Sequence, residues 1–176
     1  EGVSYEAIAK AGGGIKNTVK ATRNASFDEL YRLAKKRMCL MIKQGCLGFE
    51  IKSGYGLDLE TECKMLRVAK KLEKELGVSV STTYLGAHTL PDEFKDNSTG
   101  YVSYICNEVL PKISDESLAD SVDVFCESMG FSLKETETIF NKALALGFDI
   151  KCHAEQRSLM GASLLAASKG ALSCDH

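Results

Sequence analysis

The chain has 176 residues, 44% of them hydrophobic and 26% charged, which is typical of a soluble globular domain with one sizeable core. Its formal net charge of -2 gives no reason to expect nucleic acid or an anionic membrane as a partner. No stretch reaches the roughly 18 apolar residues needed to span a membrane, and no signal peptide is present. We therefore expect neither a membrane protein nor a secreted one.

The seven cysteines are an odd number, contain no C-x-x-C pair, and lie mostly in apolar surroundings. This favours a reducing, cytoplasmic compartment over a disulfide framework. The sequence starts abruptly at Glu1 and stops at His176, directly after a predicted strand. We expect it to be an interior piece of a longer protein.

The first half of the chain predicts two strands, each preceded by a helix. Gly12, Gly13 and Gly14 favour a loop or turn and lack the spacing of a phosphate-binding loop. Ser26 caps a helix that ends at Gly45, and a strand follows over 47–52. Asp58 or Thr61 caps the next helix, which stops at Gly77 before a β-branched strand over 78–85.

The second half repeats this alternation after a polar loop over 89–100. We expect helices over 101–110, 132–145 and 159–168, and strands over 121–127, 148–153 and 171–176. Strands that alternate with amphipathic helices indicate an α/β fold with a parallel sheet and right-handed crossovers. With no repeat and no linker, the chain is one architectural unit.

Each predicted strand leads into a polar residue, and all three histidines of the chain lie at such strand ends. The strand ends carry Lys52 and Tyr55, His88, Glu127, His153 and Glu155, and Asp175 and His176. In a parallel sheet or barrel these ends share one face, which is where such folds place their chemistry. The convergence of three imidazoles is the strongest signal that the residues give by themselves.

Structural explanations exist for each of these residues. A lone histidine at a strand end is commonly a hydrogen-bonded structural residue, Tyr55 could be a loop anchor, and Lys52 and Glu127 could form an internal ion pair. The cysteines next to these residues, Cys126, Cys152 and Cys174, are expected to face the helical layer.

Imidazoles with carboxylates suit a divalent metal such as zinc or iron. A bound metal lowers the pKa of water towards about 7 and so makes hydroxide available at neutral pH. Only His153 and His176 lie close enough in strand order to share one metal. Because two ligands are too few, we expect the others to come from outside these residues.

The run from Glu50 to Glu62, EIKSGYGLDLETE, resembles the imidazolonepropionases, metal-dependent hydrolases of the amidohydrolase superfamily that act in histidine degradation. The resemblance continues through five further motifs and so covers essentially the whole chain. These motifs are Gly12–Ile15 (GGGI), Tyr84–His88 (YLGAH), Val122–Glu127 (VDVFCE), His153–Gln156 (HAEQ) and Ser173–His176 (SCDH).

This resemblance implies that residues 1–176 are the interior portion of a single amidohydrolase-type (βα)8 TIM-like barrel domain. The present strands would be about the second to the sixth. The first strand with its H-x-H metal pair, the eighth strand with a metal-binding aspartate, and a small β-sandwich from both termini would lie outside the chain. The resemblance also implies a homodimer.

By the same resemblance, His153 would be a metal ligand and His176 a catalytic residue near the activated water. Tyr55, His88 and Gln156 would bind the small-molecule substrate, 4-imidazolone-5-propanoate, and Tyr5 would line the same pocket. Related deaminases have a glutamate at the position of Gln156 as proton shuttle. Since glutamine cannot take a proton, the base would be His176, the missing aspartate or, less favoured, Glu155.

Three other hypotheses stay open from the sequence. The enzyme could open another cyclic amide or deaminate a ring. The isolated segment could be a metal-free, catalytically incomplete barrel fragment that binds or supports other chains, because an incomplete barrel exposes two strand edges. The least favoured is a Schiff-base enzyme that uses Lys52.

Overall fold

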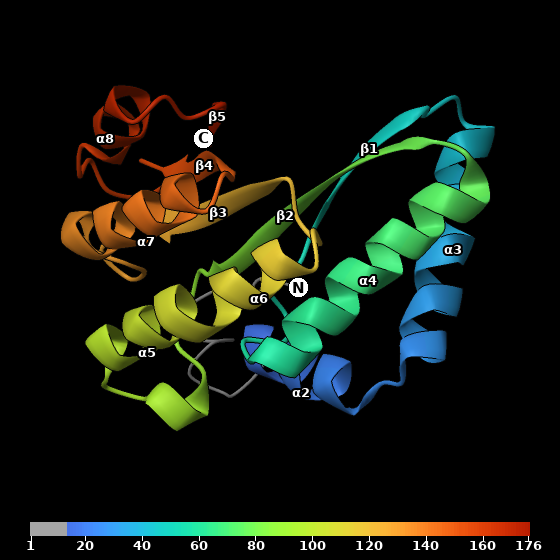
Figure 1. Cartoon of the computed structure of the whole chain (residues 1–176), viewed down its shortest axis with the longest axis horizontal. Coiled ribbons are helices and arrows are strands. Elements are labelled where there is room, and N and C mark those ends of the chain that lie inside the picture. The colour runs from blue at the N-terminus through green and yellow to red at the C-terminus, as the bar shows by residue number, and fades with distance from the viewer. Residues whose placement is uncertain (1–13) are drawn as a thin grey trace, which may run out of the picture.

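In the computed structural model, which describes residues 14–176, five strands form one parallel sheet (Figure 1). They are β1 (Gly48–Lys52), β2 (Ser79–Ala87), β3 (Ser121–Cys126), β4 (Asp149–Ala154) and β5 (Ser173–Asp175). Each strand pairs in parallel with the next one along the chain. A doubly wound sheet would reverse its strand order at some point, whereas a barrel adds each strand beside the last. The fold is therefore an α/β half-barrel, which confirms the expected fold class.

Helices cover the outer face of the sheet, and those that follow β1, β3 and β4 lie directly against its strands (Figure 1). The longer ones are α2 (Ile15–Asn24), α3 (Phe27–Lys43), α4 (Leu59–Leu76) and α7 (Leu133–Ala145), and the shorter ones are η1 (Asp92–Phe94), α5 (Ser98–Tyr104), η2 (Ile105–Val109), α6 (Leu110–Asp115) and α8 (Ala162–Ser168). Among residues 14–176, no helix combines the length and the apolar character that a membrane crossing requires.

The helix boundaries follow from the capping residues seen in the sequence. Ser26 accepts a hydrogen bond from the N–H of Glu29, and Asp58 accepts one from Thr61, so Asp58 rather than Thr61 caps α4. Ser132 and Glu135 form a reciprocal capping box at the start of α7. These bonds satisfy N–H groups that have no partner inside the helix.

Two segments differ from the prediction. Residues 15–24 form α2, where the glycines favoured only a loop, while Gly12 and Gly13 lie outside the described residues. The helix expected over 101–110 begins earlier and continues past Pro111 to Asp115, through a π-helical turn at η2. A wider turn accommodates a proline, whose ring clashes with the carbonyl four residues back in a regular α-helix.

The hydrophobic core lies between the sheet and its helices, and alternate residues of each strand point into it. On β3 these are Val122, Val124 and Cys126, and on β4 they are Ile150, Cys152 and Ala154. Cys126 and Cys152 thus face the helical layer, as expected. Cys174 is in register with Cys152 on the neighbouring strand and so points to the same face of the sheet, where it is exposed.

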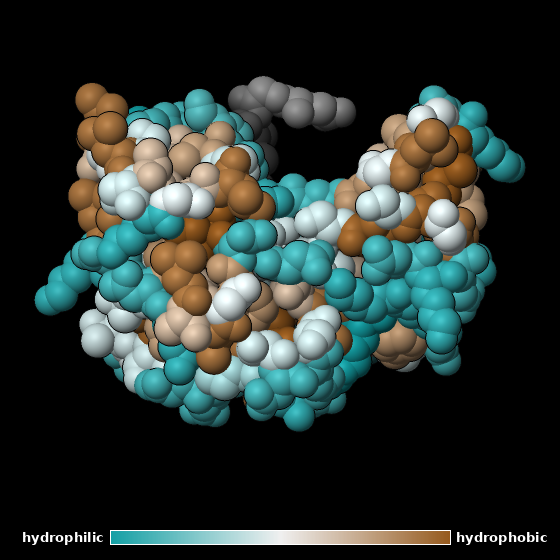
Figure 2. Space-filling model, turned by 45° about the horizontal axis from the view of Figure 1, so that its top comes forward, coloured by the Kyte–Doolittle hydropathy of each residue, from teal (hydrophilic) through white to brown (hydrophobic). Residues whose placement is uncertain are grey.

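The intervening strand residues face the hollow inner side of the half-barrel, and most of them are polar. They are Glu50, Lys52, Thr83, Ser121, Asp123, Lys151, His153 and Asp175. Figure 2 shows the molecule hollowed between the part that carries α3 and α4 and the part that carries α8. Barrel interiors are usually filled by branched apolar side chains, so this polar lining points to the site.

Candidate metal and substrate site

The centre of the polar lining is a cluster of two carboxylates, an imidazole and an ammonium group. The Lys52 Nζ lies 2.7 Å from an Asp123 carboxylate oxygen and 3.0 Å from an Asp175 oxygen. The same Asp123 carboxylate lies 3.0 Å from the Nδ1 of His153. The register places Lys151 and His153 of β4 opposite Asp123 and Phe125 of β3, and so brings His153 level with the mouth of the half-barrel.

Asp123 fixes the orientation of the His153 ring. Since a carboxylate only accepts hydrogen bonds, Nδ1 of His153 donates to Asp123. Nε2 then points away from Asp123 and lies 3.5 Å from an Asp175 carboxylate oxygen. The hydrogen bond to Asp123 raises the pKa of His153, and burial opposes this rise. An imidazole whose second nitrogen donates to a carboxylate is the usual form of a histidine metal ligand.

The structure adds two carboxylates to the candidate metal ligands His153 and His176 that strand order indicated. Ligand atoms of Asp123, His153 and Asp175 all lie within 4.8 Å of one another. One imidazole nitrogen with carboxylate oxygens suits zinc or iron. Because Asp123 and Asp175 also hold Lys52, His153 is the member whose Nε2 is most readily available to a metal.

Lys52 does not pair with Glu127, and it is not poised as a nucleophile. Burial lowers its pKa, but the hydrogen bond and charge of Asp123 outweigh this effect, so the pKa is raised overall. A Schiff-base lysine needs a neutral amine at working pH. The ion pairs that Lys52 makes with Asp123 and Asp175 contradict the predicted pair with Glu127, and they disfavour the Schiff-base hypothesis.

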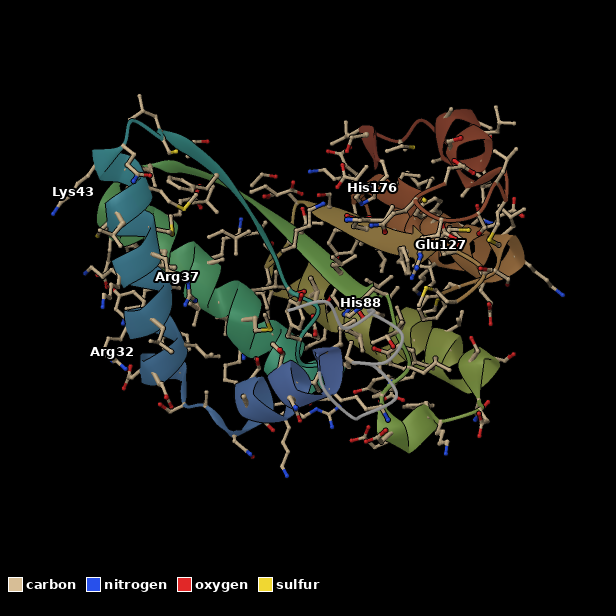
Figure 3. All side chains as sticks on the ribbon, turned by 180° about the vertical axis from the view of Figure 1, so that it is seen from behind. Arg32, Arg37, Lys43, His88, Glu127 and His176 are labelled. Carbon is tan, nitrogen blue, oxygen red and sulfur yellow. The ribbon has the colours of Figure 1, made fainter. Side chains whose placement is uncertain are left out.

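The three histidines lie on one side of the sheet, as the strand-end pattern predicts. Figure 3 labels His88, His176 and Glu127 in one part of the molecule and Arg32, Arg37 and Lys43 along α3, away from them. The ring centroids of His153 and His176 are 5.5 Å apart. The charges of His153 and Asp123 both affect the pKa of His88, which places its ring in the same polar region.

His88 and Tyr55 form a second part of this region. Their ring centroids are 5.8 Å apart at an interplanar angle of 58°, and Tyr55 is 41% exposed. The Nε2 of His88 lies 2.5 Å from the carbonyl oxygen of Gly54. Because a carbonyl only accepts, Nε2 carries the proton. Burial lowers the pKa of His88, so the ring is neutral near pH 7 and Nδ1 is an acceptor.

The loop after β4 carries Gln156, which is exposed. Glu127 at the end of β3 holds this loop by accepting hydrogen bonds from the N–H groups of Arg157 and Ser158 and from the Ser158 hydroxyl. Glu155 accepts from the N–H groups of residues 161, 162 and 163 at the start of α8. Glu155 therefore caps a helix, which disfavours it as the general base. Tyr5 lies outside the described residues.

The hydrogen bonds of Glu127 predict an acid-sensitive contribution to stability. The Ser158 hydroxyl, with backbone N–H groups, lowers the pKa of Glu127 to about 2, below the unfolded value of about 4.3. This contribution is present above pH ~4.3 and is lost as the pH falls through about 2. Glu127→Gln should cost about 2 kcal/mol of unfolding free energy at pH 7.

Urea unfolding of the full-length protein at pH 7 and at pH 3 measures this effect. Between pH 7 and pH 3, the free energy of unfolding should fall less in the variant than in the wild type. Glu137→Gln, on α7 in a partly exposed ion pair with Lys169, is the control and should change stability little. An equal pH dependence in wild type and Glu127→Gln would contradict the prediction.

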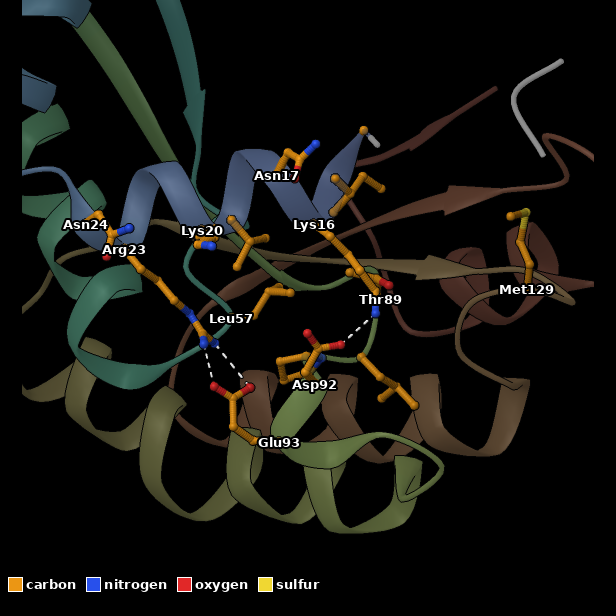
Figure 4. Close-up of a pocket in the computed structure, with 15 residues that line it drawn as sticks. Lys16, Asn17, Lys20, Arg23, Asn24, Leu57, Thr89, Asp92, Glu93 and Met129 are labelled. Carbon is orange, nitrogen blue, oxygen red and sulfur yellow. Dashed lines mark hydrogen bonds and ion pairs between the residues drawn. The ribbon is translucent and has the colours of Figure 1, made fainter. Parts of the chain in front are cut away.

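A cavity of about 570 Å³ lies beside this site, between α2 and the segment that follows His88 (Figure 4). Lys16 pairs with Asp92 and Arg23 with Glu93 across it, and Leu57 and Met129 add apolar walls. None of the three histidines lines it. The chemistry is therefore assigned to the histidine cluster rather than to this larger cavity.

Asp123 and Glu62 are the residues of this region that the sequence patterns missed as functional candidates. Asp123 lies in a strand of mostly apolar residues, which by composition alone indicates a buried strand and not a functional site. The period-two alternation of β3 carried the signal, since a carboxylate at an alternate position from Val122 and Val124 must face the opposite side of the sheet. Glu62 is a fully buried acidic residue on an amphipathic helix, and such residues are rarely buried unless their carboxyl group has hydrogen-bond partners.

No family model matches the sequence. Comparison with curated proteins gives relatives along the entire chain. An imidazolonepropionase of Legionella pneumophila (strain Paris) is 55% identical over 176 residues, 100% of this chain and 44% of the relative. Imidazolonepropionases of Shewanella loihica and Shewanella baltica are each 54% identical over 176 residues and are covered to 43%.

The chain thus spans less than half of the length of the relatives that it matches. The match runs from end to end of the chain and therefore spans all five strands and the segments that carry the histidine cluster. The resemblance to the imidazolonepropionases that the sequence motifs indicate is confirmed over the whole of this chain.

Proposed function

We propose that the full-length protein hydrolyses 4-imidazolone-5-propanoate to N-formimidoyl-L-glutamate in histidine degradation. The observation that carries the proposal is the convergence of His153, His176 and the Tyr55–His88 pair on one mouth of the half-barrel. The similarity to imidazolonepropionases along all 176 residues supports it. The reaction adds water across the cyclic amide: the oxygen bonds to the ring carbonyl carbon, the C–N bond breaks, and the released nitrogen takes a proton.

His153 would hold one divalent metal, zinc or iron, together with ligands from the remainder of the longer protein. Its Nδ1 bond to Asp123 leaves Nε2 as the nitrogen that would bind the metal, and Asp175 lies beside that nitrogen. A bound metal supplies the positive charge that makes water a nucleophile at neutral pH. Asp123 is an orienting residue here, since it keeps the ring in the tautomer that a ligand needs.

His176 would transfer protons at the reacting amide, because its ring lies beside that of His153 and its side chain is exposed at the mouth. Gln156 cannot accept a proton and would orient the substrate ring by hydrogen bonds. Tyr55 would contact the ring with its exposed face, and the neutral His88 would accept a hydrogen bond at Nδ1. We also propose that the protein is a cytoplasmic homodimer.

The alternative is another cyclic amide or an aminated ring as the substrate of the same site. The Tyr55–His88 pair favours a planar ring with an N–H group to donate to His88. A deaminase of this type uses a carboxylate as proton shuttle, and Gln156 stands at that position. These two features together favour ring opening of an imidazolone over deamination.

The test is an assay of the full-length protein with the metal quantified by elemental analysis. Loss of the ultraviolet absorbance of 4-imidazolone-5-propanoate, with formation of N-formimidoyl-L-glutamate, should require a stoichiometric metal and should cease on chelation. A panel of other cyclic amides and aminated rings should be turned over at least about 100-fold more slowly, since a site built to bond substrate polar groups rejects analogues that lack them. Turnover of a panel member but not of the imidazolone would contradict the proposal.

A further inference from the structure

Glu62 has a buried carboxylate that bonds to the loop carrying Tyr55. Its side chain is 1% exposed and comes from the first turn of α4. One oxygen accepts from the N–H of Gly54 at 2.9 Å, and the other accepts from the N–H groups of Gly56 and Leu57, both at 2.8 Å. Three of the five residues in the loop 53–57 therefore donate their backbone N–H to one side chain.

This loop has a conformation that its own residues do not favour. Leu57 has a φ of +58°, in the left-handed region that costs a non-glycine residue about 1–2 kcal/mol. Gly54 has a φ of +113°, and a Cβ added there would lie 2.5 Å from the carbonyl oxygen of Leu85. A conformation of this kind persists only where its surroundings hold it. Arg23 and Tyr101 bond to the carbonyl oxygens of Gly56 and Leu57, and Glu62 is the side chain that accepts from the loop's N–H groups.

The loop places Tyr55 outward and supports His88. Of residues 53–57, Ser53, Gly54, Gly56 and Leu57 are buried, and Tyr55 alone is exposed. Gly54 is bonded at both ends of its backbone, since its N–H donates to Glu62 and its carbonyl accepts from His88. A shift of the loop would therefore displace both rings of the Tyr55–His88 pair.

We propose that Glu62 is a positioning residue for substrate binding, which acts through the backbone of residues 54–57 to hold Tyr55 and His88 in their binding geometry. This inference rests on the proposed function. It gives each part of the SGYGLDLETE run a role in binding. Glu62 holds the loop, the glycines allow the backbone to pack closely, and Tyr55 contacts the ligand. Glu62 itself does not touch the substrate.

The experiment uses the full-length enzyme with Glu62→Gln. The amide presents one NH2 group, which must face a backbone N–H whichever way the side chain turns, so at least one loop bond is lost. We expect the KM for 4-imidazolone-5-propanoate to rise about tenfold while kcat changes less than about threefold, the signature of lost binding rather than lost chemistry. Metal content should equal that of the wild type.

Glu60→Gln is the matched control, since it removes the same charge from the same helical turn, where the side chain is exposed. Its KM should stay at the wild-type value. Glu62→Asp provides a second variant, because it keeps the charge but withdraws the oxygens by about one methylene, and its KM should rise as well. Failure of both Glu62 variants to fold would overturn the proposal, because a positioning residue is dispensable for the fold.

A double-mutant cycle with Tyr55→Ala separates positioning from general destabilisation. If Glu62 acts through the loop, Glu62→Gln should raise KM by less than about threefold once Tyr55 is absent, because groups that share one function are not additive. Full additivity, or an unchanged KM in Glu62→Gln, would overturn the inference. Failure of the proposed function would appear differently, as a wild-type enzyme that does not consume the imidazolone.

Discussion

If the proposed function holds, His153→Ala in the full-length protein should remove the bound metal and lower turnover of 4-imidazolone-5-propanoate by about a thousandfold or more, because the proposed metal would supply the activated water. His153 is the imidazole that Asp123 orients, with Nδ1 donating to the carboxylate at 3.0 Å and Nε2 directed into the site. Alanine offers no ligand atom, and the neighbouring carboxylates are already shared with Lys52. Elemental analysis and the ultraviolet assay measure the two losses independently.

Gln156→Ala is the control for this variant. Gln156 lies on the loop that follows the same strand, but it is proposed to contact the substrate and not the metal. Its metal content should equal that of the wild type, with the effect confined to substrate binding and turnover. Wild-type metal content together with a wild-type rate in His153→Ala would refute the assignment of His153.

Lys52→Met should be the most destabilising single change in the polar lining of the half-barrel. The Asp123 side chain has no exposed surface, and Lys52, whose own side chain is 22% exposed, is its cationic partner. Removal of one member of a buried ion pair leaves a charge that is neither solvated nor paired. We expect a loss of about 2–3 kcal/mol in the free energy of unfolding, less than the largest such effects because His153 still donates to Asp123.

Lys70→Met is the matched control for this change. Lys70 pairs with Asp120 at 3.3 Å, with both side chains partly exposed, and pairs of this kind contribute about 0–1 kcal/mol. Urea unfolding of the metal-free full-length protein at pH 7 compares the two variants. Equal destabilisation by Lys52→Met and Lys70→Met would show that the inner cluster is not stabilised by its ion pairs.

Much of the architecture could be predicted because it depends on local signals. Ser26 and Ser132 cap their helices where the sequence places them, and the start of each strand was predicted to within about two residues. The helix α2 was missed because glycines dominate the segment before it. The extent of the helix near Pro111 was missed because a π-helical turn depends on packing and leaves no pattern in the sequence.

The site could be predicted in part, because the position of a residue at a strand end is also a local property of the sequence. All three histidines stand at strand ends, and parallel strands bring their ends to one edge wherever the sheet forms. The partners of these histidines could not be predicted. Which carboxylate meets His153, and whether Glu155 faces the site or caps α8, depends on side-chain directions that strand order does not determine.

By itself, the amino-acid sequence determined the alternation of strands and helices, the strand-end placement of His88, His153 and His176, and the resemblance to one enzyme family. Periodicity and capping are properties of neighbouring residues, so they can be read along the chain. Only the tertiary structure decided that Asp123 orients His153, that Lys52 lies between two carboxylates, and that Glu62 holds the Tyr55 loop. These contacts join residues up to 123 positions apart, because burial forces each charge to find a partner wherever the fold brings one within reach.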